Sequence, residues 1–158
     1  MLKLYNLNAS PKEYWETWEN DGEHTVHWGA LGTKGQSKKL ASGILRNTRA
    51  SIQKEVDLRV SAGFGSIDID DHAVLMIEYT IDGMGTPADL EKRHRLEERM
   101  NETLGWTGLG HCDGGSIGSG TMEVCCFVVD FELARVAVQQ DLENSEFSDF
   151  SRIYDERA

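Results

Sequence analysis

The sequence has few of the features that mark a membrane protein, a disulfide scaffold or a disordered chain. It contains only two prolines and three cysteines among 158 residues. No segment approaches the roughly 18 consecutive apolar residues that a membrane-spanning helix needs. The N-terminal residues alternate like a strand and lack the long apolar stretch of a signal peptide. We therefore expect a cytoplasmic protein whose cysteines are buried, reduced thiols.

The composition that remains is that of a folded globule. Apolar residues make up 39% of the chain and charged residues 27%. A chain of this length can bury a sizeable core and can form one domain or two small ones. Disorder is not expected, because a disordered chain has far fewer apolar residues.

Charge is divided unequally along the chain. Residues 1–65 hold nine lysines and arginines against seven aspartates and glutamates, which gives +2. Residues 66–158 hold seven against twenty, which gives −13, and the whole chain carries −11. An acidic half would repel nucleic-acid phosphates unless it faced away from a local basic patch. The asymmetry favours two units with different partners.

A boundary between these units is predicted near residue 65. Gly63-Phe64-Gly65-Ser66 interrupts the periodicity on both sides, and the acidic Asp68-Ile69-Asp70-Asp71 follows. We expect one domain over residues 1–65 and a second, acidic domain over residues 66–158.

The first half is predicted to form strands followed by a helix. Alternation and aromatic residues indicate strands near residues 2–7, 13–18, 24–31 and 36–40, with turns at 20–22 and 32–35. From about Thr48 the pattern becomes helical, with Ile52, Val56 and Val60 on one face.

The second half is predicted to have the order β-α-β-β-α-β. Strands are expected at 72–81, 121–129 and 151–154, with a short strand and a hairpin turn in the glycine-rich stretch 108–120. Thr86 and Asp130 are expected to cap two helices. Their inner faces are formed by Leu90, Leu96, Met100 and Leu104, and by Phe131, Ala134, Val138 and Leu142. This order is that of a ferredoxin-like plait, so the fold class is α+β.

A motif in the first half resembles a known family. Residues 25–37 read TVHWGALGTKGQS. They are similar to the centre of WGR domains, where a strand runs into Trp-Gly-Arg, a hydrophobic residue and Gly-Thr-x-Gly-Gln. Tyr14-Trp15-Glu16 resembles the aromatic strand that precedes this motif, and Ala62-Gly63-Phe64 resembles the end of the family's final helix.

The resemblance implies a binding module without an active site. WGR domains are best known as parts of poly(ADP-ribose) polymerases, where they contact DNA and neighbouring domains. They also occur in bacterial proteins that have no polymerase domain. The signature arginine is Ala30 here, so contacts made by that arginine cannot be transferred to this chain.

Aromatic, glycine and lysine residues around the motif are the candidates for binding. Trp28 beside bare Gly29 would offer a flat surface, or would pack into the core. Gly32 and Gly35 suit the positive-φ positions of a turn. The lysines would form a basic edge, or would protect an edge strand from aggregation. The candidates are Trp15, Trp28, Gly29, Gly32, Lys34, Gly35, Lys38 and Lys39.

The glycine-rich stretch is the only candidate for catalysis. His111, Cys112 and Asp113 are consecutive, but three neighbouring side chains do not easily converge on one metal ion, and no second Cys/His pair has metal spacing. Alternation in a strand would point His111 away from Cys112. A structural hairpin is therefore favoured over a ligand contact or an enzyme, and no cofactor or metal is expected.

An acidic run near the C-terminus leaves two interpretations. It could mimic phosphate groups and block a basic site on a partner, as immunity and inhibitor proteins do, or it could serve solubility. Its members are Asp141, Glu143, Glu146, Asp149, Asp155 and Glu156. We therefore expect a non-catalytic, bacterial-type accessory protein that binds a protein partner or a second copy of itself. Nucleic-acid binding through the motif is the alternative.

Overall fold

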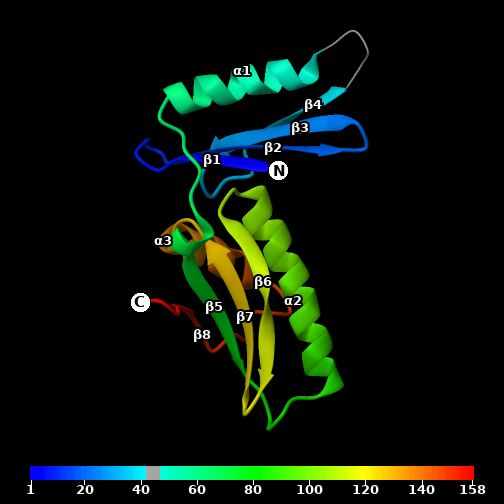
Figure 1. Ribbon diagram of the computed structural model, residues 1–158. Helices are drawn as coiled ribbons and strands as arrows, with labels where there is room; N and C mark the ends of the chain where they lie inside the picture. Colours follow the sequence, from blue (N-terminus) through cyan, green and yellow to red (C-terminus); the bar gives the residue numbers. More distant parts are fainter. Residues whose placement is uncertain (42–46) are drawn as a thin grey trace. The chain divides into compact units, whose positions relative to one another are not determined.

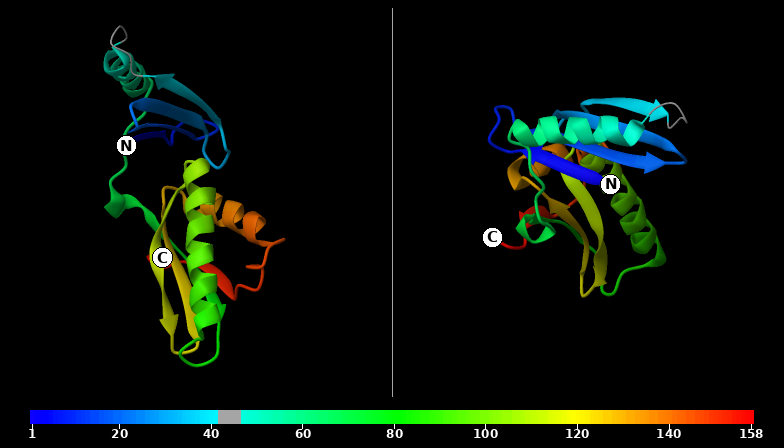
Figure 2. Two further views of the ribbon diagram at one scale, coloured as in Figure 1. Left: turned by 90° about the vertical axis from the view of Figure 1, so that its right-hand side faces the viewer. Right: turned by 45° about the horizontal axis from the view of Figure 1, so that its top comes forward.

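The computed structural model describes residues 1–41 and 47–158, and it divides the chain into two compact units (Figures 1 and 2). The first unit is Met1–Ile67 and the second is Asp68–Ala158. Within the described residues, two antiparallel four-stranded sheets and three α-helices confirm the predicted α+β class. In the part of the chain so described, none of the helices combines the length and the apolar character needed to cross a bilayer.

The first unit is one sheet covered by one helix. Its strands are β1 (Leu2–Asn6), β2 (Glu13–Asn20), β3 (Glu23–Ala30) and β4 (Gln36–Ala41), paired in that order. Helix α1 (Thr48–Ser61) lies across one face of the sheet (Figure 1). The register places Leu4 opposite Trp15, and Trp15 opposite Trp28.

The core of the first unit lies between this sheet face and α1. Leu4, Trp15, Val26 and Phe64 are buried, and Ile52 and Val56 of α1 pack against them with Trp28 and Leu40. The prediction that Val60 continues the apolar face of α1 is wrong, since Val60 is 54% exposed. The chain turns at Gly63 just after the helix, and Phe64 supplies the buried side chain in its place.

The second unit is one sheet with two crossover helices. Its elements are β5 (Ala73–Thr80), α2 (Pro87–Trp106), β6 (Gly110–Gly118), β7 (Thr121–Val128), α3 (Phe131–Leu142) and β8 (Arg152–Asp155), after a short 3-10 turn at Ile69–Asp71. The strand order is β6-β7-β5-β8. Helix α2 packs on β6 and β7, α3 packs on β5 and β8, and the helices contact each other. Both helices therefore cover the same face of the sheet.

The helix starts of the second unit follow the predicted caps. Thr86 and Asp89 form a capping box, with Pro87 in the first turn, and the Asp130 carboxylate accepts the Leu133 backbone N–H. The prediction that Leu90 lies on the inner face of α2 is wrong, because Leu90 is 39% exposed. The other three residues predicted for that face are fully buried. Leu90 and Leu96 are six positions apart, so they point in directions about 120° apart around the helix axis.

Strand β6 is longer than expected, with nine residues and a bulge between Cys112 and Gly114. Glycine is needed inside it because neighbouring groups come very close. A Cβ on Gly115 would lie 2.2 Å from the Glu123 carbonyl oxygen. From the α2 side, the Arg93 guanidinium donates to the Gly115 carbonyl at 3.1 Å.

Replacing Gly115 with alanine should destabilise the second unit. The added methyl group would push β6 away from β7, at a cost of about 1–3 kcal/mol. The matched control is Gly105→Ala in α2, where a Cβ would meet nothing within 4 Å. That change should be neutral or stabilising by up to about 1 kcal/mol. Urea unfolding followed by circular dichroism measures both, and equal stabilities of the two variants would contradict the packing described here.

Candidate binding surface

The WGR-like motif forms the end of β3 and a tight turn, residues 31–35, which we call the motif turn. Thr33 closes it, since its backbone N–H and its hydroxyl both donate to the Ala30 carbonyl, at 3.0 and 2.7 Å. Gly32 and Gly35 have φ values of +88° and +58°, as the turn prediction requires. The Leu31 N–H donates to the Lys12 carbonyl at 2.8 Å, which ties the turn to the segment before β2.

The other reason for glycine in the motif is a close backbone crossing. A Cβ on Gly29 would lie 2.7 Å from the Gly35 Cα. A Cβ on Gly35 would lie 2.2 Å from the Trp28 carbonyl oxygen and 2.5 Å from the Tyr14 hydroxyl. The motif turn is therefore folded back onto the β2–β3 pair, and only glycine at 29 and 35 permits this approach.

A buried hydrogen-bond network holds the motif turn in place. His27 Nε2 lies 2.7 Å from the Lys34 carbonyl oxygen, and the Tyr14 hydroxyl donates to the Thr33 carbonyl at 3.0 Å. Because a carbonyl oxygen only accepts, Nε2 carries a hydrogen. On the other side of the ring, Nδ1 lies 2.7 Å from Glu16 Oε1. We call Tyr14, Glu16 and His27 the anchor network.

The anchor network is shielded from water. His27 is 1% exposed, Tyr14 2% and Glu16 5%. Burial, followed by the charge of Glu16, raises the pKa of Tyr14 above its ordinary value, so its hydroxyl remains a hydrogen-bond donor. Lys3 on β1 pairs with Glu16 at 3.2 Å. None of these residues was among the predicted binding residues, although Glu16 and His27 are polar residues that face each other across β2 and β3.

The two tryptophans that were predicted to bind a partner, Trp15 and Trp28, both belong to the core of the first unit or pack against it. Trp15 is fully buried, so it belongs to the core and not to an exposed binding surface. Its neighbours Tyr14 and Glu16 point to the opposite face of the sheet, as alternation requires. Trp28 is partly buried and packs against the same core, with the Lys38 ammonium 5.8 Å from its ring. The flat aromatic surface expected beside Gly29 is thus largely covered.

Two of the three predicted lysines already have acidic partners. Lys38 pairs with Glu55 of α1, and Lys39 pairs with Glu23 of β3 at 2.8 Å. The hydrogen bond to Glu23 raises the pKa of Lys39. Lys34 is different, because it stands exposed on the motif turn while its carbonyl accepts from His27. The three lysines therefore do not form a continuous basic edge, and Lys34 on the motif turn is the one that remains a candidate for binding.

The glycine-rich stretch keeps His111 and Cys112 apart. His111 pairs with Phe127 across the sheet, and its ring lies 5.8 Å from the Phe127 ring. Cys112 pairs with Cys126 on the other face. All three cysteines are free thiols, but only Cys126 is buried, which corrects the expectation for the other two. Among the described residues no group of three or more His, Cys, Asp or Glu side chains could hold a metal ion.

Half of the acidic run is used in ion pairs within the second unit. Asp141 pairs with Arg99 at 2.7 Å, Glu146 with Arg95 at 2.8 Å, and Asp149 with Lys92 at 2.7 Å. All three basic partners lie on α2. The run is therefore partly neutralised and does not present an uninterrupted row of free carboxylates.

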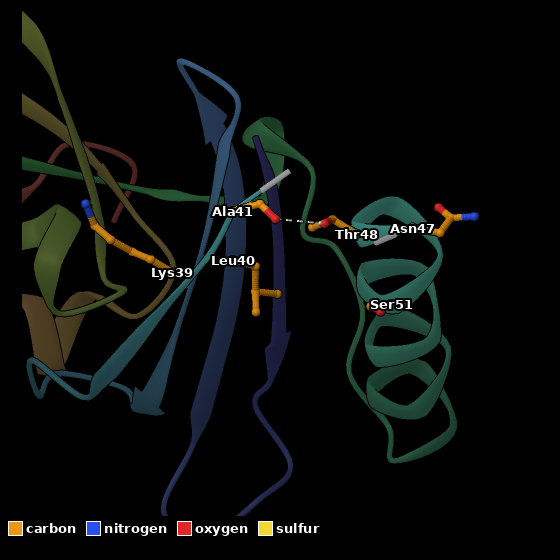
Figure 3. A pocket seen from close by; sticks show the side chains of 6 residues that line it. All are labelled: Lys39, Leu40, Ala41, Asn47, Thr48 and Ser51. Carbon is orange, nitrogen blue, oxygen red and sulfur yellow. Dashed lines mark hydrogen bonds between the residues drawn. The ribbon is translucent and has the colours of Figure 1, made fainter. Parts of the chain in front are cut away.

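A surface hollow of about 280 Å³ lies between β4 and α1 (Figure 3). Its walls come from Lys39, Leu40, Ala41, Asn47, Thr48 and Ser51. The Thr48 hydroxyl donates to the Ala41 carbonyl at 3.3 Å. Lys39 is the one charged residue among the six described residues that line the hollow, and its side chain extends away from Thr48 and Ser51 (Figure 3).

Comparisons with known proteins do not extend this description. No family model, no curated protein and no solved structure matches the chain.

Removing the Tyr14 hydroxyl should loosen the motif turn. Tyr14→Phe leaves the Thr33 carbonyl without its donor, which should cost about 1–2 kcal/mol of unfolding free energy. Hydrogen exchange of the peptide that contains residues 28–36 should accelerate. Tyr5→Phe is the control, because Tyr5 lies on the same sheet face and no hydrogen bond of its hydroxyl is found in the described part of the chain. Equal exchange in both variants would show that the anchor network does not hold the turn.

Proposed function

We propose that the chain is a non-catalytic binding protein that recognises a protein partner through the motif turn. The observation that carries the proposal is that an exposed turn is fixed from beneath by a buried, hydrogen-bonded network. Lys34 and the neighbouring Gln36 are exposed while the backbone under them is held. A pre-organised surface of this kind loses little conformational entropy on binding.

Protein is favoured over nucleic acid as the partner. Phosphate binding needs several uncompensated cations, but Lys38 and Lys39 already pair with glutamates. Ala30 stands where the WGR pattern has arginine. Trp28, the aromatic side chain on which a base would stack, is packed against the core.

The architecture of the first unit supports the WGR resemblance. An antiparallel sheet followed by one helix is what the resemblance implies, and the motif occupies the end of β3 and the turn into β4. The glycine positions shared with the family pattern coincide with the backbone crossing at Gly29 and Gly35.

The strand order and helix packing of the second unit support a ferredoxin-like plait. Its strand order β8-β5-β7-β6, with both helices on one face, agrees with the predicted β-α-β-β-α-β arrangement. We assign to this acidic unit a second contact with the partner or with another copy of the chain. An inhibitor that mimics phosphate is less well supported, because Asp141, Glu146 and Asp149 are neutralised by α2.

The surroundings of His111 and Cys112 support a non-catalytic role. A cysteine nucleophile needs a base within hydrogen-bonding reach. His111 lies on the opposite face of β6 from Cys112.

Affinity purification with charge-reversal variants tests the proposed function. We expect a stoichiometric protein to be recovered from native cells with the wild-type chain, and to persist after nuclease treatment. Lys34→Glu should lower its recovery at least tenfold, because the change places a negative charge on the motif turn. Lys54→Glu, the same charge change on the exposed side of α1, should leave recovery unchanged.

Two outcomes would overturn the proposal. Recovery of nucleic acid that is lost with nuclease and with Lys34→Glu would establish the alternative function. Equal recovery of a protein by all three chains would show that the motif turn is not the contact surface.

A further inference from the structure

Two cysteines of the second unit face each other across β6 and β7. Cys112 and Cys126 are register partners in this antiparallel pair. The Cys112 backbone N–H donates to the side-chain amide oxygen of Asn101, which lies on α2, at 3.0 Å. It therefore does not donate to β7, which identifies a non-hydrogen-bonded pair. At such positions the Cα atoms lie about 4.5 Å apart, within the range that a disulfide spans.

The third cysteine cannot replace either of them. Cys125 is opposite Gly114, and it points to the sheet face that α2 does not cover. Cys126 is fully buried on the α2 side, whereas Cys112 is half-buried. The side chains of Cys112 and Cys126 are thus on one face, that of Cys112 half-buried and that of Cys126 fully buried.

The two thiols affect each other's acidity. The hydrogen bond from the Cys126 thiol lowers the pKa of Cys112. The same contact, together with burial, raises the pKa of Cys126. Cys112 is therefore the sulfur that reacts first, since the thiolate is the nucleophile.

We propose that Cys112 and Cys126 form a redox-active pair that closes to a disulfide when it meets a low-molecular-weight disulfide such as oxidised glutathione. This inference goes beyond the proposed function and does not depend on it. It makes β6 and β7 the site of a reversible modification, and it leaves Cys125 reduced.

The reaction consists of two thiol–disulfide exchanges. The Cys112 thiolate attacks one sulfur of oxidised glutathione, whose disulfide bond breaks and releases one glutathione thiolate, which takes up a proton. Cys126 then loses its proton and attacks Cys112 Sγ, releasing the second glutathione. Two protein thiols are oxidised and one glutathione disulfide is reduced to two thiols. Because Cys126 must first be deprotonated, the second step should accelerate as the pH rises.

The surroundings of Cys112 allow this closure. The bulge between Cys112 and Gly114 leaves one residue of β6 outside the pairing, so the strand can adjust locally. Among the strands that the structure describes, β6 lies at the edge of its sheet and pairs only with β7. The bridge would tie this edge to β7, so the oxidised second unit should unfold at a higher urea concentration than the reduced one.

Oxidation of the native full chain tests the proposal. After incubation with oxidised glutathione and alkylation, we expect a product that has lost two hydrogens and has one alkylated cysteine. Cleavage after glutamate should yield residues 103–123 linked to residues 124–132, and dithiothreitol should separate them. Cys125→Ser should give the same bridge, which assigns it to Cys126.

The remaining variants distinguish the two steps. In the Cys126→Ala variant the reaction should stop at a glutathione adduct on Cys112, and the Cys112→Ser variant should form no disulfide bridge. Circular dichroism checks that both variants are folded. Three alkylatable thiols in the oxidised wild-type chain, an adduct at Cys112 that never closes, or a bridge through Cys125 would each overturn the proposal.

Discussion

A buried histidine connects the β2–β3 pair to the motif turn, and the candidate surface depends on that connection. His27 is held by Glu16 on one side and by the Lys34 carbonyl on the other, and Tyr14 adds a bond to the Thr33 carbonyl. A buried polar group that loses its partner costs about 1–3 kcal/mol. Displacing the turn would break both carbonyl contacts at once, so the turn remains fixed although it is exposed.

This constraint explains why glycines occur in the motif and which roles its other residues have. Gly29 and Gly35 permit the backbone crossing that brings the Lys34 carbonyl to His27. The tryptophan beside them contributes to the core. The signature of the motif therefore describes how the turn is built, and in the proposed function the exposed Lys34 side chain is the position where specificity can vary.

The strands and helices could be predicted from the sequence where interactions between neighbouring residues determine them. Alternation gave the strands, and Thr86 and Asp130 marked the starts of α2 and α3, because a cap needs only its own first turn. The site was less predictable, since it depends on contacts between distant residues. Nothing in the sequence near Lys38 or Asp141 shows that Glu55 or Arg99 will neutralise it. The burial of Trp15 likewise depends on which sheet face α1 covers.

The protonation of the His27 ring is the most direct test of this account. A long-range ¹H–¹⁵N correlation spectrum of the folded protein at neutral pH reports whether each ring nitrogen carries a hydrogen. The account predicts a protonated Nε2 whose hydrogen exchanges slowly, because it donates to the buried Lys34 carbonyl. An unprotonated Nε2 would contradict it, since no bond to that carbonyl could then exist and the motif turn would lack its anchor.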